Sequence, residues 1–566
     1  MFVVAQDVPQ PNAANTRRKA QSPGVSSPMM DSRCQTRVTV YSTGNEDGSR
    51  SSVQTDAEGN FSTDGLPPAA YGINAYNSAY VSAENNNSAN PKYYRLGETA
   101  LLTLTRGGVI TGRLTDAMGE PLIEMGVAAL RVRNLDGTKI RAEQRYSSTR
   151  LTDDRGRYRI YGLEPGVYIV QANATAYYYR GGDAHLGEKP LYYPSSPRES
   201  AQEITVNAGE EVRGIDLRYR GEPGFRVSGN VLGGASSAGS RYFGGISLSL
   251  KTYPGGQVVN STSVAENAPE RKFTFFGLAD GQYTLEAEGR FGNRDELDYH
   301  RGTPRRITIK GGDVANIQLQ LVPLSSIEGV VTLDPLAEKE RPAKAKPARQ
   351  AWPEETMVIL RPETERAEDD NQNLRERARK APNEKGEIKY NGLLAGRYRL
   401  TAQLPSDDWY VKAVQLPAPK AETPPAKAAA PIDVGKQGLQ LKAGDRLKGL
   451  TVTLAEGAAG LSGRIVAEKS SPPAARVHLI PAEKDAGEAV LRYYEVLAQA
   501  DGTFAFAHLA PGQYWLLAQP APRADAKPVA WDTEARNKLR QAAASNNVIE
   551  LKTCQRVNDY ALRFGK

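Results

Sequence analysis

Cysteine is scarce in this 566-residue sequence, which has only Cys34 and Cys554, near opposite ends of the chain. A disulfide framework needs more pairs than these two can make, and a zinc cluster needs closely spaced ligands. We therefore expect two unpaired thiols and no catalytic cysteine. The sequence leaves open whether the two cysteines pair with each other.

Long apolar runs and one-sided charge are also missing. No stretch approaches the roughly 18 apolar residues that cross a bilayer, so no transmembrane segment is predicted. The net charge is +7, and the basic residues are scattered rather than set in a stripe with aromatics, so nucleic-acid binding is not indicated. With 39% hydrophobic residues, 53 Gly and 36 Pro, the chain is typical of a turn-rich globular protein with several domains.

The N-terminus, MFVVAQDVPQ, has two interpretations. Val3, Val4 and Ala5 suit a signal-peptidase site, although the basic and apolar regions that should precede such a site are not in the sequence. We favour the end of a signal peptide whose beginning is missing, over a plain unstructured N-terminus. Residues 1–33 are polar and are predicted to form a disordered tail.

What the sequence does have is a motif repeated five times: FSTDGLPPAAY, YRIYGLEPGVY, FTFFGLADGQY, IKYNGLLAGRY and FAFAHLAPGQY. The final tyrosines are separated by 97, 115, 115 and 116 residues, which is the size of a whole domain. The last copy has His508 in place of the first glycine, and the first copy has Ala69 in place of the second. The motif residues are Gly65, Leu66, Tyr71, Gly162, Leu163, Gly166, Tyr168, Gly277, Leu278, Gly281, Tyr283, Gly392, Leu393, Gly396, Tyr398, Leu509, Gly512 and Tyr514.

Each copy is interpreted as a strand, a tight turn and a second strand. Alternation at period two puts Tyr158 and Ile160 on one buried face, and Pro165-Gly166 suits a tight reversal, so the pattern predicts a hairpin. The final tyrosine of each copy is expected to lie in a core. One helix is predicted near 532–545, with Asp532 as its cap.

A second repeated signal, a strand with an internal glycine, marks where units begin: Gly112, Gly229, Gly329 and Gly463. These signals predict an all-β fold, a tandem array of about five sandwiches joined end to end. The predicted boundaries are 34–107, 108–221, 222–323, 324–457 and 458–566. The fourth range carries Pro/Ala/Lys-rich insertions at 335–355 and 417–431, and the first lacks an opening strand, so its completeness stays open.

The pair GGVITGRLTDAMGEPL and TDDRGRYRIYGLEPGVYIVQA resembles the carboxypeptidase regulatory-like domain, a transthyretin-like (prealbumin-like) sandwich. This group is similar to the B-type repeats of collagen-binding proteins and to starch-binding-like folds. The resemblance runs from about residue 37 to the C-terminus and is strongest in the second copy. It implies a bacterial, non-catalytic, modular protein that is secreted, periplasmic or on the cell surface.

In metallocarboxypeptidases this module accompanies a zinc peptidase domain with an HxxE pair and a distant histidine. His185 and Glu188 match that pattern, and His300 lies downstream. The pair falls in a Gly-rich loop with no α/β domain around it, so we interpret the match as chance. We therefore predict no catalytic residues, no metal, no cofactor and no enzyme activity.

Two acidic segments could bind calcium, and a lysine–asparagine crosslink is a further possibility. Asp153-Asp154 and Asp56–Glu58 could hold calcium, but they offer too few oxygen ligands, and a hairpin turn is the favoured interpretation. Lys–Asn isopeptide crosslinks occur in some B-type repeats. Because they need a Lys, an Asn and an acid brought together in a core, the sequence leaves them open.

Tyrosine is abundant, with 27 against 11 Phe, and part of it is clustered, as in Tyr192-Tyr193. An exposed phenol beside a guanidinium suits a sugar ring or a protein partner. The alternative is that these rings pack under their own domain. The candidate ligand-binding residues are Tyr93, Tyr94, Arg95, Tyr177, Tyr178, Tyr179 and Arg180.

These features predict an exported, non-enzymatic rod of β-sandwiches that acts as a structural, adhesive or binding scaffold. Two alternatives stay open: binding of an extracellular polysaccharide, and service as an accessory regulatory subunit of a peptidase or other enzyme. The expected partners are an extracellular polysaccharide or a cell-envelope protein. The oligomeric state is not predicted.

Overall fold

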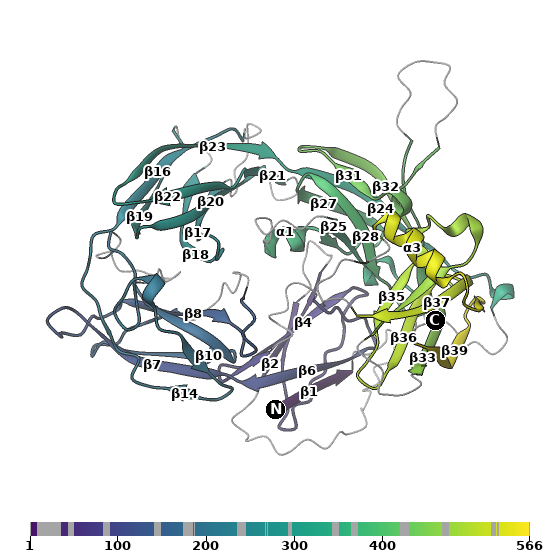
Figure 1. The fold of residues 1–566 in the computed structure, drawn as a ribbon, viewed down its shortest axis with the longest axis horizontal. Helices are drawn as coiled ribbons and strands as arrows, with labels where there is room; N and C mark the ends of the chain where they lie inside the picture. Colours follow the sequence, from purple (N-terminus) through teal and green to yellow (C-terminus); the bar gives the residue numbers. More distant parts are fainter. Residues whose placement is uncertain are drawn as a thin grey trace.

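The computed structural model describes residues 2–7, 36–43, 50–82, 91–140, 149–173, 185, 187–234, 245–265, 268, 270–292, 297–341, 350–363, 372–418, 430–466, 475–521, 528 and 531–564. The described residues form five β-sandwiches in tandem, so the predicted fold class is confirmed. In Figure 1 the sandwiches follow one another around a closed loop, with the last beside the first.

The first two sandwiches occupy the purple and blue part of the chain in Figure 1. The strands of the first are β1 (Phe2–Asp7), β2 (Arg37–Ser42), β3 (Arg50–Gln54), β4 (Tyr71–Tyr76), β5 (Tyr80–Ser82) and β6 (Thr99–Arg106). Those of the second are β7 (Gly108–Thr115), β8 (Gly126–Arg133), β9 (Thr149–Leu151), β10 (Arg157–Leu163), β11 (Gly166–Ala172), β12 (Leu191–Tyr192), β13 (Ile204–Val206), β14 (Glu211–Val212) and β15 (Leu217–Arg218).

The third sandwich differs from the others because its described strands are linked into one continuous sheet. They are β16 (Phe225–Leu232), β17 (Gly245–Thr252), β18 (Val258–Ala265), β19 (Lys272–Leu278), β20 (Gly281–Gly292), β21 (Leu297–Gly302), β22 (Arg305–Ile309) and β23 (Val314–Pro323).

The last two sandwiches carry the described α-helices. The fourth contains β24 (Ser325–Asp334), β25 (Met357–Pro362), α1 (Gln372–Arg377), β26 (Arg379–Lys380), β27 (Glu387–Leu393), β28 (Gly396–Gln403), β29 (Trp409–Leu416), β30 (Ile432–Asp433), α2 (Val434–Gln437), β31 (Leu439–Leu441) and β32 (Arg446–Glu456). The fifth contains β33 (Ala459–Val466), β34 (Ala475–Pro481), β35 (Tyr494–Leu497), β36 (Thr503–Leu509), β37 (Gly512–Pro520), α3 (Thr533–Ala543), β38 (Val548–Leu551) and β39 (Arg556–Arg563). The predicted C-terminal helix is α3, and the Asp532 side chain caps it by accepting from the Ala535 amide at 2.7 Å.

Each sandwich has a core of its own. Five large apolar clusters are built from described residues 38–104, 110–219, 227–321, 327–454 and 459–562, one for each sandwich. Burial follows the alternation of the strands, as on β10, where Tyr158 and Ile160 are buried and Arg157 and Arg159 are exposed. Each unit therefore has the separate hydrophobic core that is typical of a domain.

The two strands that the repeated motif joins do not pair with each other, so the predicted hairpin is wrong, and we call this connection an arch. In the second sandwich β10 pairs with β7, whereas β11 pairs with β8, so the two strands that the motif joins lie in different sheets. Crossing from one sheet to the other lets the apolar faces of both strands meet in one core. In the first copy, only the strand after the turn forms.

The final tyrosine of every copy is buried and closes the arch with its hydroxyl group. The phenol donates to the backbone carbonyl four residues upstream, a tyrosine corner of the kind found in immunoglobulin-like sandwiches. The bonds are Tyr168 to Glu164 at 2.6 Å, Tyr283 to Ala279 at 2.9 Å, Tyr398 to Leu394 at 2.9 Å, Tyr514 to Ala510 at 2.7 Å, and Tyr71 to Pro67. The tyrosine therefore stabilises both the core and the turn.

The glycines of the opening strands mark a close approach of two backbones. In the second to fifth sandwiches, the opening strand pairs in parallel with the closing strand of the same unit. A Cβ at the glycine would overlap the carbonyl oxygen of the closing strand. The pairs are Gly112 with Ile215, Gly229 with Ile317, Gly329 with Leu450, and Gly463 with Tyr560.

Among the described residues, the first sandwich has no such opening strand, and β1 pairs with its closing strand β6 in the antiparallel direction instead. The expectation of a disordered tail over 1–33 is therefore wrong for Phe2–Asp7, whereas residues 8–33 lie outside the described residues. The reason is physical. β6 has an edge that no opening strand covers, and the β-branched Val3 and Val4 favour an extended backbone.

The sandwiches are not simply joined end to end, as a rod requires. The first sandwich packs against the fourth through an apolar cluster of Ala70, Tyr93, Met357 and Ala381. The Ala70 amide donates to the Glu354 carbonyl at 2.8 Å across this contact. Because the two sandwiches are far apart in the sequence, their contact closes the loop seen in Figure 1.

Candidate functional site

The tyrosines predicted to bind a ligand in the first sandwich are buried. Tyr93 is 8% exposed and lies in the contact with the fourth sandwich, while Tyr94 is 2% exposed and belongs to the core of the first. Arg95 pairs with Glu98 and donates to the Leu404 carbonyl at 2.9 Å. Tyr93 and Arg95 therefore serve the contact between sandwiches and Tyr94 packs in a core, so neither ring is exposed as the prediction of a ligand site assumed.

The second predicted cluster, Tyr177, Tyr178, Tyr179 and Arg180, lies outside the described residues. The nearby Tyr192 is buried in the second sandwich, where the Arg198 guanidinium stacks on its ring, and Tyr193 packs against the same core. In the tyrosine clusters, all the rings that the structure describes are therefore packing groups.

The HxxE residues do meet in space. His185 Nδ1 lies 2.7 Å from a Glu188 oxygen, and the imidazole packs edge-on against Tyr219. His300 belongs to β21 in the third sandwich, where it packs against Phe291. Among the described residues, no group of three or more potential ligands gathers as a metal site would require.

The acidic residues that could have held calcium stabilise turns instead. Asp153 accepts from the Arg155 amide at 3.0 Å and the Arg157 amide at 2.7 Å, and the Arg157 bond leads in lowering the pKa of this carboxyl. Asp56 accepts in the same way from the amides of residues 58 and 60. Carboxylates held by local amides shape a turn.

In the described part of the chain, the groups that bear on a covalent crosslink are one cysteine and one buried lysine. Cys554 is a half-buried free thiol, and Cys34 lies outside the described residues. Lys251 is the one buried lysine among the described residues, and its ammonium pairs with Glu286 at 3.1 Å, with Arg301 on the same carboxylate. An isopeptide bond would need an Asn at this lysine.

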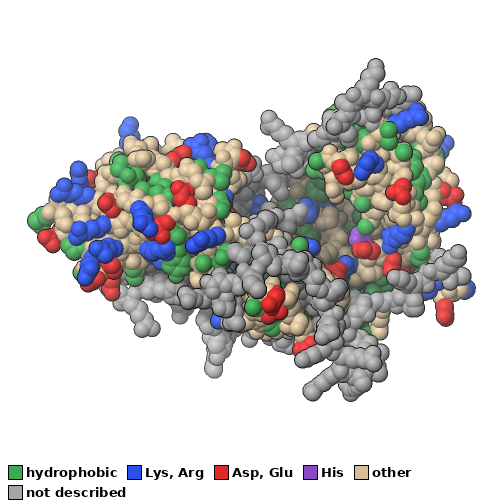
Figure 2. Space-filling view, turned by 90° about the horizontal axis from the view of Figure 1, so that it is seen from below, with side chains coloured by type: hydrophobic (Ala, Val, Ile, Leu, Met, Phe, Trp, Pro, Cys, Tyr) green, Lys and Arg blue, Asp and Glu red, His purple; other side chains and the backbone are tan. Residues whose placement is uncertain are grey.

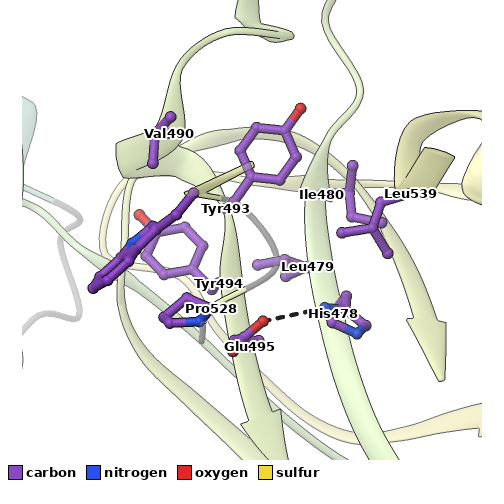
Figure 3. Close-up of a pocket in the computed structure, with 10 residues that line it drawn as sticks. His478, Leu479, Ile480, Val490, Tyr493, Tyr494, Glu495, Pro528 and Leu539 are labelled. Carbon is purple, nitrogen blue, oxygen red and sulfur yellow. Dashed lines mark ion pairs between the residues drawn. The ribbon is translucent and has the colours of Figure 1, made fainter. Parts of the chain in front are cut away.

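A small cavity of about 60 Å³ lies in the fifth sandwich. Figure 3 shows it between β34, the segment leading into β35, and α3. Its polar groups are His478 and Glu495, and the rest is aromatic and aliphatic. The lining residues are His478, Leu479, Ile480, Val490, Tyr493, Tyr494, Glu495, Pro528, Trp531 and Leu539.

His478 is the unusual group of this cavity. It is 3% exposed on a strand whose residues are all buried. Burial, and then the Arg476 charge, lower its pKa to about 4, so the imidazole is neutral at neutral pH. Glu495 lies 3.7 Å from Nδ1, as the dashed line in Figure 3 shows, but this carboxylate already binds Arg476 at 2.9 Å. The attraction between Glu495 and a protonated His478 therefore does not offset the loss of solvation that lowers the His478 pKa.

The cavity is too small for a sugar or a drug-sized molecule. Binding pockets usually measure roughly 300–1,000 Å³, so this one accommodates water or a small side chain. His478 was not among the predicted site residues, although a single histidine inside the apolar run ARVHLIP was a signal for it. Chemically, the site is a buried neutral imidazole, His478, beside the Arg476–Glu495 ion pair. Protonation of this imidazole in acid would place a charge inside the fifth sandwich.

The comparisons with known proteins assign no family to this chain. No family model matches this chain, and no curated protein matches it. Among solved structures, the chain is similar to the Bacillus anthracis TIE protein, at 12% identity over 87% of this chain and 70% of that one, with a TM-score of 0.14. A minor pilin of Streptococcus agalactiae is 13% identical over 39% of this chain and 96% of its own, with a TM-score of 0.18.

The described helices include none that is long and apolar enough to span a bilayer.

Proposed function

We propose that this chain is an exported, non-enzymatic scaffold that holds five β-sandwiches in a closed arrangement and presents their outer faces for binding. The observation that carries the proposal is the contact between the first and fourth sandwiches. Besides its apolar cluster, it has the Arg95 bond to Leu404 and a bond from Gln403 to the Tyr93 carbonyl at 2.5 Å. Contacts of this kind fix positions that short linkers alone would leave free.

The resemblance of the second sandwich to carboxypeptidase regulatory-like modules supports export and a non-catalytic role. Export is tested by fractionating the producing cells and probing for the chain with an antibody. Recovery in the envelope or the medium is expected, and recovery in the cytoplasm alone contradicts export.

The closed arrangement is tested by small-angle X-ray scattering. We expect the wild-type profile to match the closed loop and the double variant Arg95→Ala/Gln403→Ala to expand, because it removes both side-chain bonds to the partner backbone. Arg464→Ala is the control, since this arginine is exposed in the fifth sandwich. A wild-type profile typical of an extended row of sandwiches contradicts the proposal.

The non-enzymatic part has its own test. The purified chain should contain no stoichiometric zinc and should leave peptides intact. One tightly held zinc per chain that is lost in His185→Ala contradicts this part of the proposal.

A further inference from the structure

An arginine-rich patch covers the outer face of the sheet formed by β10, β7 and β14. Because Tyr158 and Ile160 point into the core, Arg157 and Arg159 point to solvent, and Arg113 on β7 lies directly opposite Arg157. In Figure 2, Lys and Arg side chains gather on the left-hand body, where the second sandwich lies. The arginines of this basic face are Arg113, Arg157, Arg159, Arg213 and Arg218.

The positive charge of the basic face is only partly neutralised. Glu211 accepts from Arg159 and from Arg213, each at 3.0 Å, and Asp216 accepts from the Arg113 amide at 2.8 Å. Asp153, in the turn before β10, accepts from the Arg157 amide at 2.7 Å and interacts with the Arg157 charge. Five arginines against these three carboxylates leave two positive charges in excess. Like charges directly opposite in a sheet are destabilising, and an anionic ligand would relieve that repulsion.

The other repeats provide an internal comparison. In the fourth sandwich, Lys389 takes the position of the second arginine of β10, but Glu328 lies between it and Lys448, at 3.8 and 3.1 Å. In the third and fifth sandwiches the same position holds Thr274 and Ala505. The common fold therefore does not require this concentration of arginine.

We propose that the basic face binds a carboxylate-bearing polysaccharide, an inference that rests on the proposed scaffold function. Guanidinium groups pair with carboxylates through two parallel hydrogen bonds. Alternate residues on a strand lie about 6.7 Å apart and neighbouring strands about 4.8 Å apart, so the arginines form rows along which an extended anionic chain can lie. A solvent-exposed face also suits a polymer that the small cavity of the fifth sandwich could not admit.

The shape of the face disfavours nucleic acid. A flat sheet inserts neither a helix nor a two-stranded ribbon into a groove. Single strands bind through several stacked bases, whereas the described aromatic on this face is Tyr161, whose ring is covered by the Arg150 guanidinium at 4.5 Å.

The test measures binding of the full chain to sodium alginate, a polymer of uronic acids, with neutral dextran as the reference polymer. The double variant Arg157→Glu/Arg159→Glu should weaken alginate binding by about tenfold or more, and added salt should weaken wild-type binding. The control, Lys389→Glu/Lys448→Glu, reverses the same number of charges on the equivalent face of the fourth sandwich and should bind like the wild type. Arg213→Glu, whose side chain is 78% exposed, repeats the test without touching β10.

Equal losses in the test and control variants would assign the binding to net charge and overturn the inference. Wild-type binding to dextran as tight as to alginate would overturn it too, as would tighter binding to single-stranded DNA or to poly-glutamate. None of these outcomes changes the scattering profile of the closed loop, so a failure here is distinguishable from a failure of the scaffold proposal.

Discussion

His478 makes the fifth sandwich sensitive to acid. The histidine pKa is about 6.5 in the unfolded chain and about 4 in the folded one, chiefly because burial disfavours the imidazolium. The folded state therefore has its full stability above pH 6.5 and loses it as the pH falls toward 4. A difference of about 2.5 units corresponds to about 3 kcal/mol of unfolding free energy.

This loss of stability can be measured by hydrogen exchange of the β34 amides. Exchange is monitored by mass spectrometry between pH 7 and pH 4 and corrected for the intrinsic exchange rates. Protection in wild type should fall by about 3 kcal/mol across that window, a large fraction of a domain's stability. His478→Gln should abolish most of the fall, because the amide does not titrate. His185→Gln, in the second sandwich, should leave it unchanged. Constant protection of β34 in wild type, or an undiminished fall in His478→Gln, would refute the reasoning.

Three further predictions concern the repeats and the contact that closes the loop. Tyr283→Phe should lower the unfolding free energy of the third sandwich by about 1 kcal/mol, measured by urea denaturation, because it removes one hydrogen bond and leaves the ring. Gly463→Ala should lower the unfolding free energy of the fifth sandwich by about 1–3 kcal/mol in the same urea experiment, because the new methyl group overlaps the Tyr560 carbonyl. The control is Gly312→Ala, which should be nearly neutral because a methyl group at Gly312 meets open space. Burial raises the pKa of Glu354, so the contact that closes the loop should weaken as the pH rises through that pKa; Glu354→Gln should remove this dependence in scattering measured from pH 4 to pH 8.

The repeat, its spacing and the burial of its final tyrosines could be predicted from the sequence, because alternation and turn residues are local signals. The arch could not, since a strand, a turn and a strand look alike whether the second strand pairs with the first or crosses to another sheet. The strand partners decide between the two, as when Tyr158 lies opposite Gly112 and Tyr168 opposite Arg131. The sequence also did not predict the backbone strain at His508, which replaces a motif glycine and yet has a φ of +60°.

The expectation that Tyr93 is an exposed ring is wrong for a related reason. Tyr93 and Arg95 have the chemistry of a ligand site, but a contact between domains also buries aromatic rings and satisfies guanidinium groups. Their partners, Gln403 and Leu404, lie about 310 positions away, beyond any local pattern.

The repeats themselves separate stability from recognition. Residues that keep one role in all copies, such as the final tyrosine, are explained by the fold, because the same corner forms each time. A residue type that one copy alone concentrates at an equivalent position has no such explanation. Tyr93 and Arg95 are explained by the contact with the fourth sandwich, whereas no other sandwich covers Arg157 and Arg159 in the part of the chain that the structure describes. A binding function is therefore best sought where copies differ and no neighbouring sandwich accounts for the difference, which is the arginine face of the second sandwich.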